Sequence, residues 1–412
     1  MNYSEEYQQL KELYTTDADE IFIPDSPVRI LNFEFQSRPE MLSGLPGYKE
    51  DRTISENLQF RYPVFVPDGK NRSRKAIVFL HGLNERNWYK HLAGAKRLSE
   101  KTGKAVIMFP LSFHINRGMQ EWTNTRKMAQ VLETRKQKFP GVRESSIVNL
   151  ALSERLTQYP QRFFTSGMQS AMDLVALLTQ IRKGVHPLFE VHSGIDIFAY
   201  SISCMLLQTL MISDESEVLR GCKIVFFAGG SIFSHLQGVS KFIMDSVAFD
   251  TIQEFYAGLF KKEAGFSRNK ELQYCMMEHN FGKAFGSVLS PKIRKKEREN
   301  GMAAFSSSLM VIALRDDKII PLEGIKLAMG EKFCRSEQFS VVHFPYPYIH
   351  ENPFPVLYRK IEEQVEQSFR LVYDQAIQFF TGNRPDKRKA TAFSFSGSCD
   401  RHSAGWIGRK AV

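Results

Sequence analysis

Short, fully apolar runs alternate along this chain with segments of helical period, and that alternation restricts the fold more than any other feature. The run "KAIVFLHG" at 75–82 ends at a glycine, a helix-like segment follows at 85–103, and "KAVIMFPL" at 104–111 is a second apolar run. Strands buried on both faces have such uninterrupted apolar runs, and a strand–helix–strand unit makes a right-handed crossover between parallel strands. The sequence therefore predicts an α/β fold with a mostly parallel, twisted sheet.

The alternation continues toward the C-terminus, so we expect helices on both faces of the sheet. Further strand-like runs lie at 30–35, 60–67, 194–201, 222–230, 307–314 and 338–346. Further helix-like runs lie at 166–184, 202–213, 322–333 and 353–380.

The alternation also suggests how the 412 residues divide into parts. We expect an N-terminal helix and first strand region at 1–59, a main domain at 60–380 and a basic, flexible tail at 381–412. Two stretches of the main domain are too long for plain connections. Residues 112–165 read as irregular, and residues 231–305 carry helix-like patterns.

The excess positive charge is local. The chain has a net charge of +10, of which residues 381–412 supply +5 and residues 290–299 supply +3. Neither segment interleaves its charges with aromatic residues as nucleic-acid-binding surfaces do. We therefore interpret both as solvated surface, although an anionic partner such as a membrane surface stays a possible reading.

The cysteines and the hydropathy of the chain indicate the cellular compartment in which we expect the protein. The five cysteines form no C-x-x-C pair and are odd in number, so neither a disulfide framework nor a zinc site is indicated. The first twenty residues are polar and acidic, and no apolar run reaches the roughly 18 residues of a membrane span. We expect a soluble, cytoplasmic protein without a transmembrane segment, and the sequence does not indicate its oligomeric state.

A serine stands where an apolar run becomes a helix-like pattern. In "IDIFAYSISCMLLQTLM" at 195–211, Ser201 is flanked at a distance of two by Ala199 and Ser203. Small flanking residues suit a nucleophilic serine on a sharp strand-to-helix turn, for which the usual pattern is G-x-S-x-G. Both glycines are absent here, so the alternative is that Ser201 simply caps a helix.

An acid and a histidine follow in the order that such a serine requires. Asp316 and Asp317 come just after the run at 307–314, and His350 lies in a loop after the run at 338–346. The carboxyl ends of parallel strands meet at one edge of a sheet, where open α/β sheets build their sites. We expect His350 to be the base and Asp317, which directly precedes "KIIP", to orient it; Asp316 reads as a solvated loop acid. His343 lies inside the strand-like run and reads as a packed strand residue.

Four segments together resemble the α/β-hydrolase superfamily over residues 60–380. They are "IVFLHGLNE" at 77–85, "AYSIS" at 199–203, "DDKIIP" at 316–321 and "IHENP" at 349–353. The pattern is more similar to a bacterial branch of the superfamily than to a named esterase.

The resemblance implies further parts of a site. The backbone N–H groups of Leu83 and Ile202 would form the oxyanion hole, and the insertion at 231–305 would form a lid. It implies no cofactor, and we expect none: no dinucleotide or phosphate-loop motif is present, and His279 has no second ligand at helical spacing, so no metal is expected.

Five side chains are candidates for contact with substrate, because two stand in the quoted segments and three follow the strand-like run at 104–111, whose end should face the same crevice. They are Asn84, His114, Arg117, Trp122 and Tyr200. Of these, Arg117 is the one expected to meet an anionic group of the substrate. The alternatives are a turn or cap role for Asn84 and, for the residues after 110, a surface loop that packs on the lid.

Two functions fit these observations. The first is a serine hydrolase that cleaves an ester or related acyl bond of a small-molecule substrate through an acyl-enzyme intermediate. The alternative is a non-catalytic binding protein of the same fold, because the glycines of the serine turn are missing. The sequence does not identify the acyl substrate.

Overall fold

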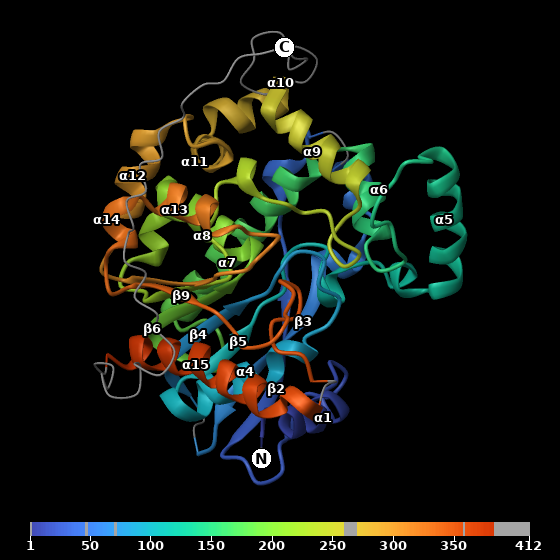
Figure 1. The fold of residues 1–412 in the computed structure, drawn as a ribbon. Coiled ribbons are helices and arrows are strands. Elements are labelled where there is room, and N and C mark those ends of the chain that lie inside the picture. The colour runs from blue at the N-terminus through green and yellow to red at the C-terminus, as the bar shows by residue number, and fades with distance from the viewer. Residues whose placement is uncertain (1, 46–47, 70–71, 259–269, 357–358, 383–412) are drawn as a thin grey trace, which may run out of the picture.

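A nine-stranded mixed sheet forms the centre of the protein (Figure 1). The structure, a computed structural model, describes residues 2–45, 48–69, 72–258, 270–356 and 359–382. The strands are β1 (Glu20–Phe22), β2 (Val28–Gln36), β3 (Gln59–Pro67), β4 (Ser73–Leu80), β5 (Ala105–Met108), β6 (Phe189–Tyr200), β7 (Ile224–Phe227), β8 (Leu309–Leu314) and β9 (Phe339–Val342).

The strand order is β1-β2-β3-β5-β4-β6-β7-β8-β9. The six strands from β5 to β9 in this order run parallel, whereas β1, β2 and β3 add an antiparallel edge. The predicted fold class, an α/β fold with a mostly parallel sheet, is therefore confirmed.

Fifteen α-helices are described around the sheet. They are α1 (Tyr3–Leu13), α2 (Tyr48–Asp51), α3 (Ser55–Leu58), α4 (Tyr89–Thr102), α5 (Thr125–Lys138), α6 (Leu150–Gln158), α7 (Arg162–Arg182), α8 (Ile202–Ile212), α9 (Ser246–Gly258), α10 (Lys270–Gln273), α11 (Asn280–Leu289), α12 (Lys295–Ala303), α13 (Leu322–Met329), α14 (Glu331–Cys334) and α15 (Glu362–Thr381).

Both faces of the sheet are buried, which explains the uninterrupted apolar runs. In β4, Ile77 and Phe79 pack in one core with α1, α4 and α15, whereas Val78 and Leu80 pack in a second core with α7 and α8. Figure 1 shows the sheet between these two helical layers. Because successive side chains of a strand point to opposite faces, a strand buried on both sides must be apolar at every position.

The stretch at 112–165 is helical, and the expectation that it is irregular was wrong. It contains α5 and α6, and α7 begins within it at Arg162. In α5 only Arg135 is buried, so the helix has no apolar stripe from which a sequence pattern could reveal it. Figure 1 shows α5 standing away from the sheet.

The second long stretch, between β7 and β8, forms α9 to α12 in its described part. Helices α11 and α12 pack against α8, the helix that follows β6 (Figure 1). The tail from residue 383 onward, whose flexibility the sequence predicts, lies outside the described residues.

The strand order and the position of the serine identify the fold more closely. Ser201 lies between the end of β6, in the middle of the sheet, and the start of α8. A nucleophile turn at a central parallel strand is the hallmark of the α/β-hydrolase fold. The chain has that fold, as the resemblance implied.

We predict that Gly94→Ala in α4 destabilises the protein. A Cβ at this position would lie 2.1 Å from the Tyr373 hydroxyl, and the Tyr373 ring is itself stacked on Phe198 at 5.5 Å. Overpacking of this kind costs about 1–3 kcal/mol of the free energy of unfolding, which chemical denaturation measures.

Gly167→Ala in α7 is the matched control. A Cβ there meets nothing within 4 Å, so the change should raise the free energy of unfolding by about 0.5–1 kcal/mol. Equal effects at the two glycines would contradict the packing of α4 against α15.

Candidate active site

Ser201 occupies a strained turn. Its backbone has φ 61° and ψ −121°, a conformation that residues with a side chain rarely adopt. The Ser201 N–H donates to the Phe227 carbonyl at 3.1 Å, and the Ser201 carbonyl accepts from the Cys204 N–H at 3.0 Å. The turn is thus held by strand β7 on one side and by the first turn of α8 on the other.

The small flanking residues leave room for this turn. Ala199 and Ser203 are both fully buried, and the Ser203 hydroxyl donates to the His81 carbonyl. On the β7 side, a Cβ at Gly229 would lie 2.5 Å from the Ser201 carbonyl oxygen, so only glycine fits there. The turn therefore forms without its usual glycines. Ser203, which stands where the second glycine usually lies, links α8 to the loop after β4.

The three side chains singled out in the sequence meet at one edge of the sheet. The Ser201 Oγ lies 2.6 Å from the His350 Nε2, and the His350 Nδ1 lies 2.7 Å from an Asp317 carboxylate oxygen. All three residues are buried. Because Nδ1 faces a carboxylate, it carries the proton of the neutral ring, which leaves Nε2 free to accept from the serine hydroxyl.

Asp317 is itself held in place by the backbone. Its second carboxylate oxygen accepts the N–H groups of Ile319 and Ile320, each at 2.9 Å. Asp316, the alternative acid, is more than half exposed and lies 2.8 Å from the His343 Nδ1. His343 follows β9 and is exposed at the surface, so the interpretation of it as a packed strand residue was wrong.

Tyr200 lies behind His350 rather than in a substrate pocket. Its ring stacks on the His350 ring at 5.6 Å with an interplanar angle of 13°, and its hydroxyl donates to the His350 carbonyl. The side chain is buried and does not line the large cavity described below. The expectation that Tyr200 contacts substrate was therefore wrong, because its position in β6 directs it into the core on the α4 side.

A buried carboxylate that the sequence analysis did not single out shapes the loop after β4. Glu85 accepts the Gly82 N–H at 2.8 Å and lies 2.7 Å from the His91 Nε2 and 2.9 Å from the Lys90 Nζ. Burial disfavours its charge, yet His91 and Lys90 outweigh this and hold the pKa of Glu85 well below its ordinary value. In the sequence, the basic residues Lys90 and His91 at the start of α4 were the signal that could have pointed to a paired acid at position 85.

The proposed oxyanion donors lie on either side of this arrangement. Leu83 belongs to the loop that Glu85 holds, and Ile202 is the first residue of α8. Among the described residues, neither the Leu83 N–H nor the Ile202 N–H has a recorded hydrogen-bond partner. Their role as oxyanion donors stays a prediction.

His81 ties this loop to the loop after β5. Its Nδ1 donates to the Gly82 carbonyl at 2.7 Å, and its Nε2 accepts the Leu111 N–H at 2.9 Å. The bond that Nε2 accepts requires the neutral ring, and burial together with His114 lowers the pKa of His81 to about 3.

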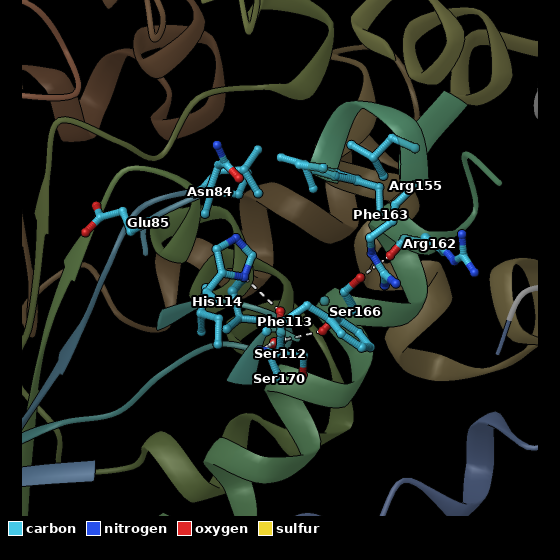
Figure 2. A pocket seen from close by; sticks show the side chains of 18 of the residues that line it. Asn84, Glu85, Ser112, Phe113, His114, Arg155, Arg162, Phe163, Ser166 and Ser170 are labelled. Atoms are coloured by element: carbon cyan, nitrogen blue, oxygen red, sulfur yellow. Dashed lines mark hydrogen bonds between the residues drawn. The ribbon is translucent and has the colours of Figure 1, made fainter. Parts of the chain in front are cut away.

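A large, mainly apolar cavity opens beside Leu83 and Ile202. It encloses about 1140 Å³ of atom-free space, part of it open to solvent, and is lined by the loops after β4 and β5 and by helices α6, α7, α8 and α11. Asn84, His114 and Trp122 line it as expected for substrate contacts (Figure 2 labels the first two). Their contact with substrate stays a prediction.

Arg117 does not line the cavity. Its guanidinium is fully buried, lies 2.7 Å from an Asp173 carboxylate oxygen, and donates to the carbonyls of Pro110 and Asn57. The expectation that Arg117 meets an anionic group of substrate was wrong, because Asp173 already compensates its charge. The cavity is lined instead by Arg86, Arg155 and Arg162, of which Arg155 is paired with Asp51 at 2.9 Å.

Other features limit the chemistry. Within the described ranges, no group of three or more His, Cys, Asp or Glu residues could hold a metal ion. None of the helices in the described part of the chain has the length and apolar character needed to cross a membrane. Cys204, Cys222, Cys275 and Cys334 are free thiols, and Cys399 lies outside the described residues.

Residues 48–381 match the model of a family of unknown function, DUF6051. No curated protein matches the chain.

Among solved structures, an esterase from Pyrobaculum calidifontis is similar, with a TM-score of 0.44, 14% identity and 91% of each chain covered. Carboxyl esterase 2 from Tuber melanosporum has a TM-score of 0.45 and 10% identity over 91% of this chain and 96% of its own. The bacterial brefeldin A esterase has a TM-score of 0.45 and 10% identity over 92% and 84% of the two chains.

We predict that His81 makes the stability of the protein fall as the pH is lowered. The pKa of His81 is about 3 in the folded chain and about 6.5 when unfolded. Below pH 6.5 the unfolded chain therefore binds a proton that the folded chain does not, and the free energy of unfolding decreases. Denaturation of wild type and His81→Asn at pH 7, 6, 5 and 4 should show a shallower decrease for the variant, which retains a donor but does not titrate. Equal slopes would show that His81 is not held neutral.

Proposed function

We propose that this chain, which belongs to the DUF6051 family, is a serine hydrolase that cleaves an ester or related acyl bond of a small-molecule substrate. The observation that carries the proposal is the continuous chain of two hydrogen bonds, 2.6 Å from the Ser201 hydroxyl to His350 and 2.7 Å from His350 to Asp317. These distances are those of a nucleophile, its base and the group that orients the base.

In the proposed reaction, the Ser201 Oγ attacks the acyl carbon and its proton passes to the His350 Nε2. Asp317 keeps the ring in the required orientation and stabilises the imidazolium that forms. His350 then protonates the leaving alcohol, and an acyl-enzyme on Ser201 remains. Water, deprotonated by His350, attacks the acyl-enzyme and releases the acid.

Two N–H groups would stabilise the negative charge that develops on the acyl oxygen. Ile202 offers its N–H at the start of α8, where the helix adds positive potential. Leu83 offers its N–H from a loop held by Glu85 and His81. Donors fixed before the reaction cost no reorganisation during it, which is what makes an oxyanion hole effective.

The alternative function, binding without turnover, was raised by the missing glycines of the serine turn. Ser201 adopts a positive φ despite Ala199 and Ser203, and its hydroxyl bonds to a base. This geometry supports the hydrolase over binding without turnover, and it is the hydrolase that we propose. We further propose that the helices at 231–305 act as the lid of the site, because α11 contributes Phe281 and Phe285 to the cavity wall.

The first prediction of this proposal concerns the nucleophile. A fluorophosphonate probe should label the wild-type protein on Ser201, because the hydroxyl is activated by His350. Ser201→Ala should take up no label, as read by intact-protein mass spectrometry. Equal labelling of the variant, or none of the wild type, would exclude Ser201 as the nucleophile.

The second prediction separates the two neighbouring acids. Asp317→Asn should lower kcat for a p-nitrophenyl ester by about 10⁴-fold, because it stabilises the wrong tautomer of the base. Asp316→Asn removes the same charge at an exposed position whose carboxylate pairs with His343, so kcat should change less than about twofold. Similar losses in both variants would contradict the assignment of Asp317.

A further inference from the structure

The large cavity contains a buried imidazole that the proposed reaction does not use. His114 is 8% exposed and lines the cavity next to the loop that carries Leu83. Its Nδ1 donates to the Ser112 carbonyl at 2.8 Å, so in the neutral ring Nε2 presents a lone pair. Among the described residues, Nε2 has no hydrogen-bond partner. Buried acceptors are normally satisfied, so an unpaired one at a cavity wall indicates that a donor is supplied from outside.

The ring stays neutral under ordinary conditions. Burial lowers the pKa of His114 to about 4, although the bond to the Ser112 carbonyl acts in the opposite direction. At neutral pH the Nε2 atom therefore accepts hydrogen bonds and does not donate them.

Asn84 adds a second acceptor to the same cavity. Its Nδ2 donates to the Val148 carbonyl at 3.1 Å and to the Phe242 carbonyl at 2.6 Å, which uses both amide hydrogens. The Oδ1 atom then has no donor recorded within the described part of the chain. Figure 2 shows the bond from His114 to Ser112 at one edge of the ring, with Asn84 toward the opposite edge.

The charges of the cavity wall determine what kind of donor fits. Arg155 lines the cavity with its guanidinium 4.3 Å from the Phe113 ring centre, and Asp51 compensates its charge. Arg86 also lines the cavity, but it binds only the carbonyls of Trp122 and Val148, and no ion pair is recorded for it in the described ranges. Glu85 lines the cavity as well, but its carboxylate is paired with Lys90 and His91, so an ammonium group would meet the uncompensated charge of Arg86 and a neutral donor is favoured.

The remaining wall is mainly apolar. It includes Leu152, Phe163, Met205 and Phe285, whose side chains offer no hydrogen bonds and therefore disfavour small polar ligands. A ligand that satisfies the wall is thus apolar over most of its surface and carries a neutral hydrogen-bond donor where it reaches His114.

We propose that the cavity binds an apolar part of the substrate that carries a hydroxyl or amide N–H, and that His114 selects this substrate by accepting its hydrogen bond at Nε2. The proposal rests on the proposed hydrolase function and specifies the substrate class of the same site. A site built to bond such a group discriminates against the analogue that lacks it, because the buried acceptor is then left unpaired.

Matched esters test the proposal on the full-length protein. Each pair consists of an aliphatic ester and the same ester with one added hydroxyl or one added amide N–H. The added group is moved along the chain from one pair to the next. One set of pairs is modified in the acyl part and a second set in the alcohol part. Wild type should hydrolyse at least one donor-bearing ester with a kcat/KM at least about tenfold above its parent, the effect of one buried hydrogen bond.

The variants assign this preference to His114. His114→Phe keeps the ring but removes the acceptor and should reduce the preference to about twofold or less. His114→Gln keeps an acceptor oxygen and should retain part of the preference, which a purely structural role would not produce. His343→Phe, an exposed control, should keep all of it.

The possible failures are distinguishable. Wild type that hydrolyses the plain esters without preferring any donor-bearing partner overturns the His114 proposal and leaves the hydrolase intact; this measurement needs no variant. A preference that His114→Phe leaves unchanged also overturns it. Wild type that hydrolyses none of the esters, or Ser201→Ala that hydrolyses them equally, contradicts the hydrolase itself.

Discussion

The backbone of Ser201 is the constraint on which the rest of the site depends. A positive φ at a residue with a side chain costs about 1–3 kcal/mol and persists only where surrounding structure enforces it. Here strand β7 holds the Ser201 N–H through the Phe227 carbonyl, and glycine at position 229 lets β7 approach closely. The turn lies at the end of β6, a strand in the interior of the sheet whose last six residues are all buried, so its strain is carried by rigidly packed structure. The hydroxyl thereby projects toward His350 while the N–H of Ile202 begins α8 with no partner in the described chain.

Around this turn, buried polar side chains do the positioning that glycines do elsewhere. Ser203 binds the His81 carbonyl, His81 binds the backbone at Gly82 and Leu111, and Glu85 binds the Gly82 N–H. The two bonds to Gly82 hold the loop after β4, the Ser203 bond joins that loop to α8, and the Leu111 bond joins it to the loop after β5, so the three form one connected unit. Such a network is effective because every member is satisfied, since an unpaired polar group at the same depth would cost more than its bond contributes. His114 differs from these residues: it lines the cavity, and its Nε2 has no hydrogen-bond partner within the described part of the chain.

Sequence reasoning succeeded where one local pattern carried the information. The double-sided burial of the sheet produces apolar runs, and the order of Ser201, Asp317 and His350 follows from their positions after successive strands. It failed where a residue type has several uses. Arg117 was expected at the substrate but neutralises Asp173 inside the protein, and Tyr200 was expected in the pocket but packs behind His350. Helix α5 was missed because it buries almost nothing and so leaves no periodic pattern.

The sequence by itself determined that this chain forms a mostly parallel α/β sheet with a serine at a strand-to-helix turn, because strand burial and turn sterics act over a few neighbouring residues. Only the tertiary structure decided which polar side chains meet. Glu85 is buried beside Lys90 and His91, Arg117 pairs with Asp173 inside the protein, and the His114 Nε2 has no hydrogen-bond partner among the described residues. These outcomes depend on distances between segments far apart in the chain, and the physical reason is that a hydrogen bond requires contact within about 3 Å, which no spacing along the sequence specifies.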